Sequence, residues 1–139
     1  MSDARFRLPD TWPAPHDAAA GDRLLERFAD QGKAEARLAK RAGVAALLRC
    51  LGGNSPYLGD LAVRESVALQ RLVADGPDAV VDAAMRNLHA LEPEADRART
   101  TATLRQAKRV IALAAAVADI GGLWRLEQVT SALSTLAET

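Results

Sequence analysis

The hydrophobic residues of this chain recur at intervals of three and four positions, which is the spacing of one face of an α-helix. The longest uninterrupted stretch, from Glu94 to Ile120, predicts a helix roughly 40 Å long at 1.5 Å per residue. Its second half is apolar on almost every side and should be buried, whereas its first half is rich in basic residues and should be solvated. The apolar positions are Leu104, Ala107, Val110, Ile111, Leu113, Ala114, Val117 and Ala118, and the basic ones are Arg97, Arg99, Arg105, Lys108 and Arg109.

Two helices are predicted before residue 54. Asp17 offers an N-cap for the first, and Gly32 can close it as the C′ residue that follows the helix end. A second helix begins at once, carries leucine and valine at helical spacing, and ends at Gly52-Gly53. Prolines at 9, 13 and 15 force extended backbone before them, so residues 1–16 are predicted to form an irregular arm.

Further stop and start signals divide the middle of the chain. Ser55-Pro56 can open a helix, because the serine hydroxyl accepts a hydrogen bond from a free backbone amide and proline at the first helical position needs no donor. A kink or a fresh helix start is expected near Ser66, where polar residues interrupt the apolar stripe. Asp-Gly-Pro at 75–77 and Glu-Pro at 92–93 then each end one helix and start the next.

The last segment places Leu126, Val129, Leu133 and Leu136 on one stripe, with no stop signal at its end. We expect this stripe to be partly exposed and to give weak, concentration-dependent self-association, with Trp124 adding a large amphipathic ring at its start. No strand-like alternation bounded by turns appears. The predicted fold class is therefore all-α, a helical bundle or array with a long central helix and no β-sheet, in which residues 17–139 form one helical domain.

Charge and composition exclude several classes of protein. Basic and acidic residues both number 18, and the resulting formal net charge of zero argues against a nucleic-acid partner or an anionic membrane surface. The longest apolar run, residues 110–118, is too short beside the roughly 20 residues that a membrane-spanning helix requires. The single cysteine, Cys50, and the polar N-terminus without a secretory signal fit a reducing cytoplasm.

Few side chains suggest chemistry. The glycines before Ser55 could cradle a phosphate, but no strand precedes them and no lysine follows, which favours a turn between helices. His16 and His89 have no metal ligand at helical spacing, and His89 is expected in the last turn of its helix. Asp119 ends an apolar helix; its carboxylate either accepts amides of the turn at 121–123, pairs with Arg125, or belongs to an active site completed elsewhere. The basic residues at 97–109 are expected to form a solvated face, with an acidic protein surface as the alternative partner.

Two segments of the chain resemble one known family. They read LLRCLGGNSPYLGDLAVRE at 47–65 and LRQAKRVIALAAAVADIGGLWRLEQVTSALSTLAE at 104–138, and together they are similar to the glutamine synthetase adenylyltransferase/adenylyl-removing enzyme family. The similarity covers about residues 36–139. In that family these segments lie in the helical N-terminal part of a large polypeptide with two transferase halves, the first of which removes AMP from glutamine synthetase. The break at 64–66 differs from the proline-containing version of the family.

The resemblance implies a parent enzyme that uses ATP and magnesium, but it assigns no catalytic residue to this sequence. The family's chemistry depends on a glycine-serine turn followed by an Asp-x-Asp pair that holds magnesium, and no Asp-x-Asp occurs here. We therefore predict no catalytic, cofactor-binding or metal-binding residue, and no cofactor, in this segment. The positions that match the family pattern, for which a structural role is expected, are Asn54, Ser55, Pro56, Tyr57, Asp119, Gly121, Gly122 and Trp124.

The function inferred from the resemblance is that of the N-terminal helical segment of an enzyme that adds AMP to glutamine synthetase or removes it, and so controls nitrogen assimilation. The segment alone is predicted to be inactive. Its expected partner is the catalytic domain of the parent chain, with glutamine synthetase as a further candidate. The alternative is a free-standing helical protein-interaction module without an enzymatic parent.

Overall fold

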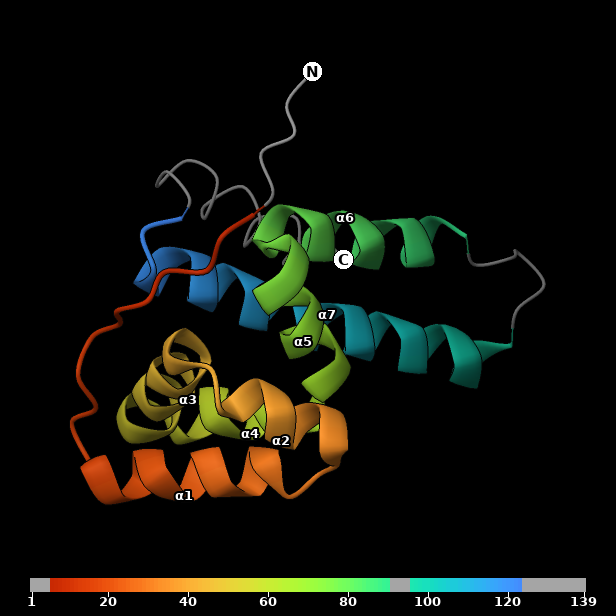
Figure 1. Cartoon of the computed structure of the whole chain (residues 1–139). Helices are drawn as coiled ribbons and strands as arrows, with labels where there is room; N and C mark the ends of the chain where they lie inside the picture. The colour runs from red at the N-terminus through yellow and green to blue at the C-terminus, as the bar shows by residue number, and fades with distance from the viewer. Residues whose placement is uncertain (1–5, 91–95, 124–139) are drawn as a thin grey trace. The chain divides into compact units, whose positions relative to one another are not determined.

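The computed structural model describes residues 6–90 and 96–123, which form seven α-helices and no strand (Figure 1). The all-α prediction is confirmed for this part of the chain. None of these helices combines the length and the apolarity needed to cross a membrane. The helices are α1 (Ala18–Ala29), α2 (Lys33–Ala39), α3 (Ala42–Asn54), α4 (Pro56–Arg64), α5 (Ser66–Asp75), α6 (Pro77–His89) and α7 (Arg97–Ile120).

The chain divides into two compact units, Met1–Gly76 and Pro77–Thr139, and each is described by itself. The first unit holds the N-terminal arm and α1 to α5, and the second holds α6 and α7. That residues 17–139 behave as one helical domain stays a prediction. The predicted apolar stripe after Trp124 and the predicted signal at 92–93 lie outside the described residues.

The first unit closes around aliphatic side chains and one phenylalanine. Its most extensive helix pair is α1 with α3, and α4 packs against both. Burying one such side chain stabilises the folded state by about 1.5–3 kcal/mol relative to leaving it exposed to water. The buried core residues of this unit include Leu24, Phe28, Val44, Leu47, Leu48, Leu51, Leu61, Leu69 and Leu72. The helical spacing of leucine and valine in the sequence therefore identified the core faces of α1 and α3 correctly.

The close contact of α1 with α3 corrects one predicted helix end. A Cβ atom added to Gly52 would lie 2.5 Å from Cβ of Leu24 in α1, closer than real Cβ atoms come. Gly52 thus permits the two helices to approach, and it keeps helical backbone while doing so. The prediction that the helix ends at Gly52-Gly53 is wrong, because α3 continues through both glycines to Asn54.

Two other predicted boundaries differ from the structure. The first helix ends at Ala29, and Gly32 has extended backbone (φ 173°) just before α2, so Gly32 does not close α1 as a C′ residue. The predicted second helix is two helices, α2 and α3, separated at Arg41 (φ −73°, ψ 132°). Neither glycine nor proline causes this break. Close by, a Cβ on Gly43 would lie 2.9 Å from the carbonyl oxygen of Pro9, so the distant arm packs against the start of α3.

Three other predicted helix starts are confirmed. Asp17 Oδ1 accepts the backbone amide of Ala20 at 3.0 Å, which caps α1. A fresh helix starts at Ser66, after Arg64 ends α4. The Asp-Gly-Pro signal at 75–77 separates α5 from α6, and its glycine has a left-handed φ of 91°.

The second unit is a helical hairpin in which α6 and α7 run antiparallel (Figure 1). Its described core joins Ala84 of α6 to Ala107 and Ile111 of α7. α7 begins at Arg97 rather than at the predicted Glu94. Its 24 residues give a length of about 36 Å.

The two halves of α7 differ as the sequence predicts. The residues of its second half that are buried are Ile111, Leu113, Ala114, Ala115, Val117 and Ala118. The basic residues of its first half that are exposed are Arg97, Arg99, Arg105 and Lys108. Arg109 is half-buried, so the solvated face is narrower than predicted.

Stability of the second unit should depend on Ile111, which is only 2% exposed. Ile111→Ala should lower the free energy of unfolding by about 2–5 kcal/mol, because it removes buried carbon atoms and leaves a cavity. Arg99→Ala is the control on the same helix and should change stability by less than about 0.5 kcal/mol, since that side chain is exposed. Denaturant midpoints of the two variants test this, and the reverse order would contradict the packing of α7.

Candidate functional site

The positions that match the family pattern lie in two places in the structure. Four of them form the junction of α3 and α4 in the first unit, and three form the end of α7 in the second. The junction positions are Asn54, Ser55, Pro56 and Tyr57, and the α7 positions are Asp119, Gly121 and Gly122. Trp124 lies outside the described residues. The structure thus brings these residues together within each group, and each group is described by itself.

Ser55 alone joins α3 to α4. Its extended backbone (φ −151°, ψ 105°) ends α3, and its amide donates to the carbonyl oxygen of Leu51 at 2.9 Å. Its hydroxyl accepts the amide of Leu58 at 3.2 Å, and Pro56 occupies the first helical position, which needs no donor. The predicted cap at Ser55-Pro56 is confirmed, and this one residue caps both helices.

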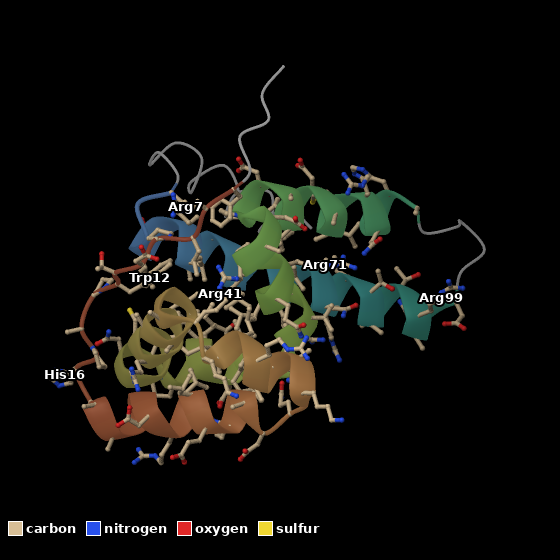
Figure 2. The ribbon with its side chains drawn as sticks, in the orientation of Figure 1. Arg7, Trp12, His16, Arg41, Arg71 and Arg99 are labelled. Carbon is tan, nitrogen blue, oxygen red and sulfur yellow. The ribbon has the colours of Figure 1, made fainter. Side chains whose placement is uncertain are left out.

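Asn54 connects the end of α3 to the N-terminal arm. Its Oδ1 accepts the backbone amide of His16 at 2.8 Å, and its Nδ2 donates to the carbonyl oxygen of Ala14 at 3.1 Å. Beside it, the amide of Asp17 donates to the carbonyl oxygen of Gly53 at 3.0 Å. Figure 2 shows His16 where the arm turns into α1, with its imidazole pointing away from the helices. The carboxamide of Asn54 therefore clamps the arm just before α1 begins.

The rest of the arm follows the first unit from α5 past α3 (Figure 1). The Phe6 ring lies against Gly76 at the end of α5, where an added Cβ would come within 2.6 Å of the ring. Trp12 Nε1 donates to the carbonyl oxygen of Pro9 at 3.0 Å, which folds the arm on itself. Pro15 packs where Gly53 has no side chain. Residues 6–16 contain no helix or strand, and these contacts dock them against the first unit.

The sequence pattern places Asn54 in a turn but does not indicate its partners. The available signal was a carboxamide, which offers both a donor and an acceptor, directly after two glycines at a helix end. Tyr57 is different, because its side chain is 62% exposed. A single exposed aromatic side chain is common on protein surfaces and does not define a site.

Main-chain hydrogen bonds close the end of α7. The amide of Gly122 donates to the carbonyl oxygen of Asp119 at 3.2 Å, and the amide of Leu123 donates to that of Ala118 at 2.8 Å. With Gly122 at a left-handed φ of 64°, this is a Schellman motif. The amide of Gly121 donates to the carbonyl oxygen of Val117.

These bonds bear on the predicted role of Asp119. The amides at 121–123 donate to main-chain carbonyl groups, so the prediction that the Asp119 carboxylate accepts them is wrong. Its side chain is exposed, and hydration removes most of the cost of a negative charge at a helix C-terminus. The alternative partner, Arg125, lies outside the described residues.

The interactions described at both places cap helix ends, and at the α3–α4 junction they also hold the N-terminal arm. In residues 6–90 and 96–123, no three His, Cys, Asp or Glu side chains are grouped so that they could hold a metal ion. His89 lies in the last turn of α6, as predicted, and is exposed. The geometry at α3–α4 fixes the angle between two helices and holds the arm against them.

The clamp can be tested with Asn54→Ala. Each lost hydrogen bond should cost about 1 kcal/mol, and hydrogen exchange at the amide of His16 should become faster because its acceptor is gone. Ser55→Ala is the matched control, because it should also cost about 1 kcal/mol through the cap of α4. In this control, exchange at His16 should change only as much as global stability does. An unchanged exchange rate in Asn54→Ala would contradict the clamp.

The end of α7 gives a second test. An alanine at Gly122 would find open space but a left-handed backbone, so Gly122→Ala should destabilise the chain by about 1–2 kcal/mol through backbone strain alone. Gly122→Asn should cost less, because asparagine adopts this conformation more readily. Thermal and denaturant unfolding of both variants measures the order, and equal losses would show that strain is not the cause.

Comparisons with known proteins find one family, and the matched range includes the positions described above. A family model described as glutamate-ammonia ligase adenylyltransferase matches residues 45–139. Three similar proteins are each named bifunctional glutamine synthetase adenylyltransferase/adenylyl-removing enzyme. That of Rhodopseudomonas palustris (strain BisB5) is 38% identical over 140 residues and covers 96% of this chain. Those of Caulobacter vibrioides and Bradyrhizobium diazoefficiens are 33% and 36% identical and cover 86% and 89%. No solved structure matches significantly.

The chain spans 14%, 14% and 13% of the lengths of these three relatives. The family match extends over more than half of the chain and includes both the α3–α4 junction and the end of α7. Because the relatives also cover most of the chain, it belongs to the glutamate-ammonia ligase adenylyltransferase family.

Proposed function

We propose that this chain is the N-terminal helical segment of a bifunctional glutamine synthetase adenylyltransferase/adenylyl-removing enzyme, and that it supports the parent enzyme without carrying a catalytic group. The observation behind this proposal is the set of hydrogen bonds that the family-pattern residues make at the α3–α4 junction. Asn54 and Ser55 direct their side-chain hydrogen bonds to the arm and to α4. Their roles are structural, and the chemistry of the parent enzyme then belongs to other parts of its chain.

The requirements of nucleotidyl transfer support the same division of roles. Such reactions use paired carboxylates that bind magnesium, which bridges the phosphates of the nucleotide. The sequence has no Asp-x-Asp pair. ATP and magnesium, which the parent enzyme is expected to use, would therefore be bound outside this segment. Its partner is the rest of the parent chain, and glutamine synthetase is the protein on which the parent acts.

The isolated chain should neither add AMP to glutamine synthetase nor remove it. Incubation with ATP, magnesium and glutamine synthetase, followed by mass analysis of the synthetase, should show no AMP adduct. The reverse incubation with adenylylated synthetase should leave the adduct intact. The full-length Caulobacter vibrioides relative serves as the positive control in both directions. An adduct that forms or disappears only when this chain is present would refute the proposal.

A chimera tests the supporting role. This chain replaces the matching segment of the Rhodopseudomonas palustris relative, to which it is 38% identical. We expect the chimera to transfer AMP within about tenfold of the natural relative, a difference of about 1.4 kcal/mol in the barrier. Deletion of the segment should abolish transfer. Full activity after deletion would instead favour the alternative, a helical interaction module that the catalytic parts do not need.

A further inference from the structure

The short helix α2 presents a row of positive charges to solvent. Lys33 and Arg37 lie at i and i+4 of α2, Lys40 follows at i+7 as the C-cap residue, and Arg41 comes directly after it. All four side chains are exposed. In Figure 1, α2 is the short orange helix above α1, and it also contacts α3 and α5. We call these four residues the cationic face.

α2 contributes no buried residue to the core of the first unit. α2 has seven residues, none of them buried, and its N-terminus has no side-chain cap. It is tied to its neighbours by Gln70 Nε2, which donates to Glu35 Oε2 at 3.3 Å. A helix of this length is not stable alone in water, and like charges four residues apart weaken it further. The four cations are therefore held together against their mutual repulsion.

These cations differ from Arg27 and Arg49 of the first unit, which are in ion pairs. Arg27 pairs with Asp60 at 3.2 Å, and Arg49 pairs with Asp22 at 3.0 Å. Both pairs neutralise cations of α1 and α3. Neither pair includes a residue of the cationic face, so its charge is directed to solvent. The chain as a whole carries no net charge, so this face is a local excess of positive charge.

We propose that the cationic face is a docking surface for an acidic segment of a protein partner. From Lys33 to Lys40 the charges extend over about 10 Å along the helix, which matches several carboxylates in a row rather than one small anion. Small anions are bound by donors that converge in a concave site. The arrangement instead suits charge complementarity between two protein surfaces, which speeds association and selects partners.

A nucleic acid is the less suitable partner. Proteins that bind single strands stack bases on aromatic side chains, and the residues from 33 to 41 include no aromatic. Domains that bind duplexes are usually strongly basic overall, whereas this chain has a pI near 6.7. This inference does not depend on the proposed enzymatic parent, because it concerns only charges on this chain.

The test measures binding of a fluorescein-labelled oligoglutamate peptide to the purified chain by fluorescence anisotropy. The first variant changes all four residues of the cationic face to glutamine, a good helix former. The matched control changes four exposed basic residues of α7 to glutamine and removes the same charge. The two variants are Lys33→Gln/Arg37→Gln/Lys40→Gln/Arg41→Gln and Arg97→Gln/Arg99→Gln/Arg105→Gln/Lys108→Gln.

We expect the first variant to lose at least about tenfold in affinity, and the control to lose much less. Binding should weaken as salt is added. Equal losses in the two variants would overturn the proposal, because net charge would then explain binding. No binding by the natural chain would also overturn it. The proposal would also be overturned if oligouridine or phosphatidylserine vesicles bound to these residues more tightly than the peptide does.

Circular dichroism verifies that the variants keep their helices. If the fourfold variant unfolds, the pair Lys33→Gln/Arg37→Gln replaces it and should lose part of the affinity. The variant Arg37→Lys/Arg41→Lys keeps the charge and should bind as the natural chain does. Loss of binding in this last variant would overturn a role for charge alone.

Discussion

The close approach of α1 and α3 is the constraint on which the rest of the first unit depends. Gly52 permits it, because Leu24 of α1 occupies the space that a side chain would need. Once the two helices meet, Phe28 and the leucines of α3 can close the core. The start of α1 also comes beside the end of α3, where the amide of Asp17 reaches the carbonyl oxygen of Gly53. The clamp and the junction are built at this same end.

Two consecutive residues complete this end of α3. Asn54 satisfies the backbone of the arm, and Ser55 satisfies the first turn of α4. The bond to Ser55 is partly buried, where an unpaired amide would cost as much as a lost hydrogen bond, whereas the two bonds of Asn54 are exposed to solvent. The family match includes these residues. Their role in holding three segments together gives a physical reason for this motif that does not require a reaction at the site.

Local signals in the sequence predicted the parts of the fold that local physics determines. Ser55 and Asp17 have cap chemistry that any helix start can use, and the spacing around Ile111 shows a buried face. The break at Arg41 and the partners of Asn54 were not predictable in this way. The break at Arg41 has no glycine or proline to mark it. The partners of Asn54 lie on an arm that is distant in sequence, and helical periodicity contains no information about such contacts. The role of Gly52 was missed for the same reason, because a helix-ending glycine and a close-packing glycine look alike in sequence.

The single-residue connection at Ser55 restricts how this region can change in evolution. A longer loop can absorb an inserted residue without moving the helices that it joins. The connection here has no spare loop residue, because α3 ends at residue 54 and α4 begins at residue 56. Inserting one residue would rotate α4 by about 100° relative to α3, since a helix has 3.6 residues per turn. That rotation would turn the buried side of α4, with Leu61 and Ala62, away from the core. Substitutions can be tolerated at many positions of these helices, but the length of the chain between them is fixed.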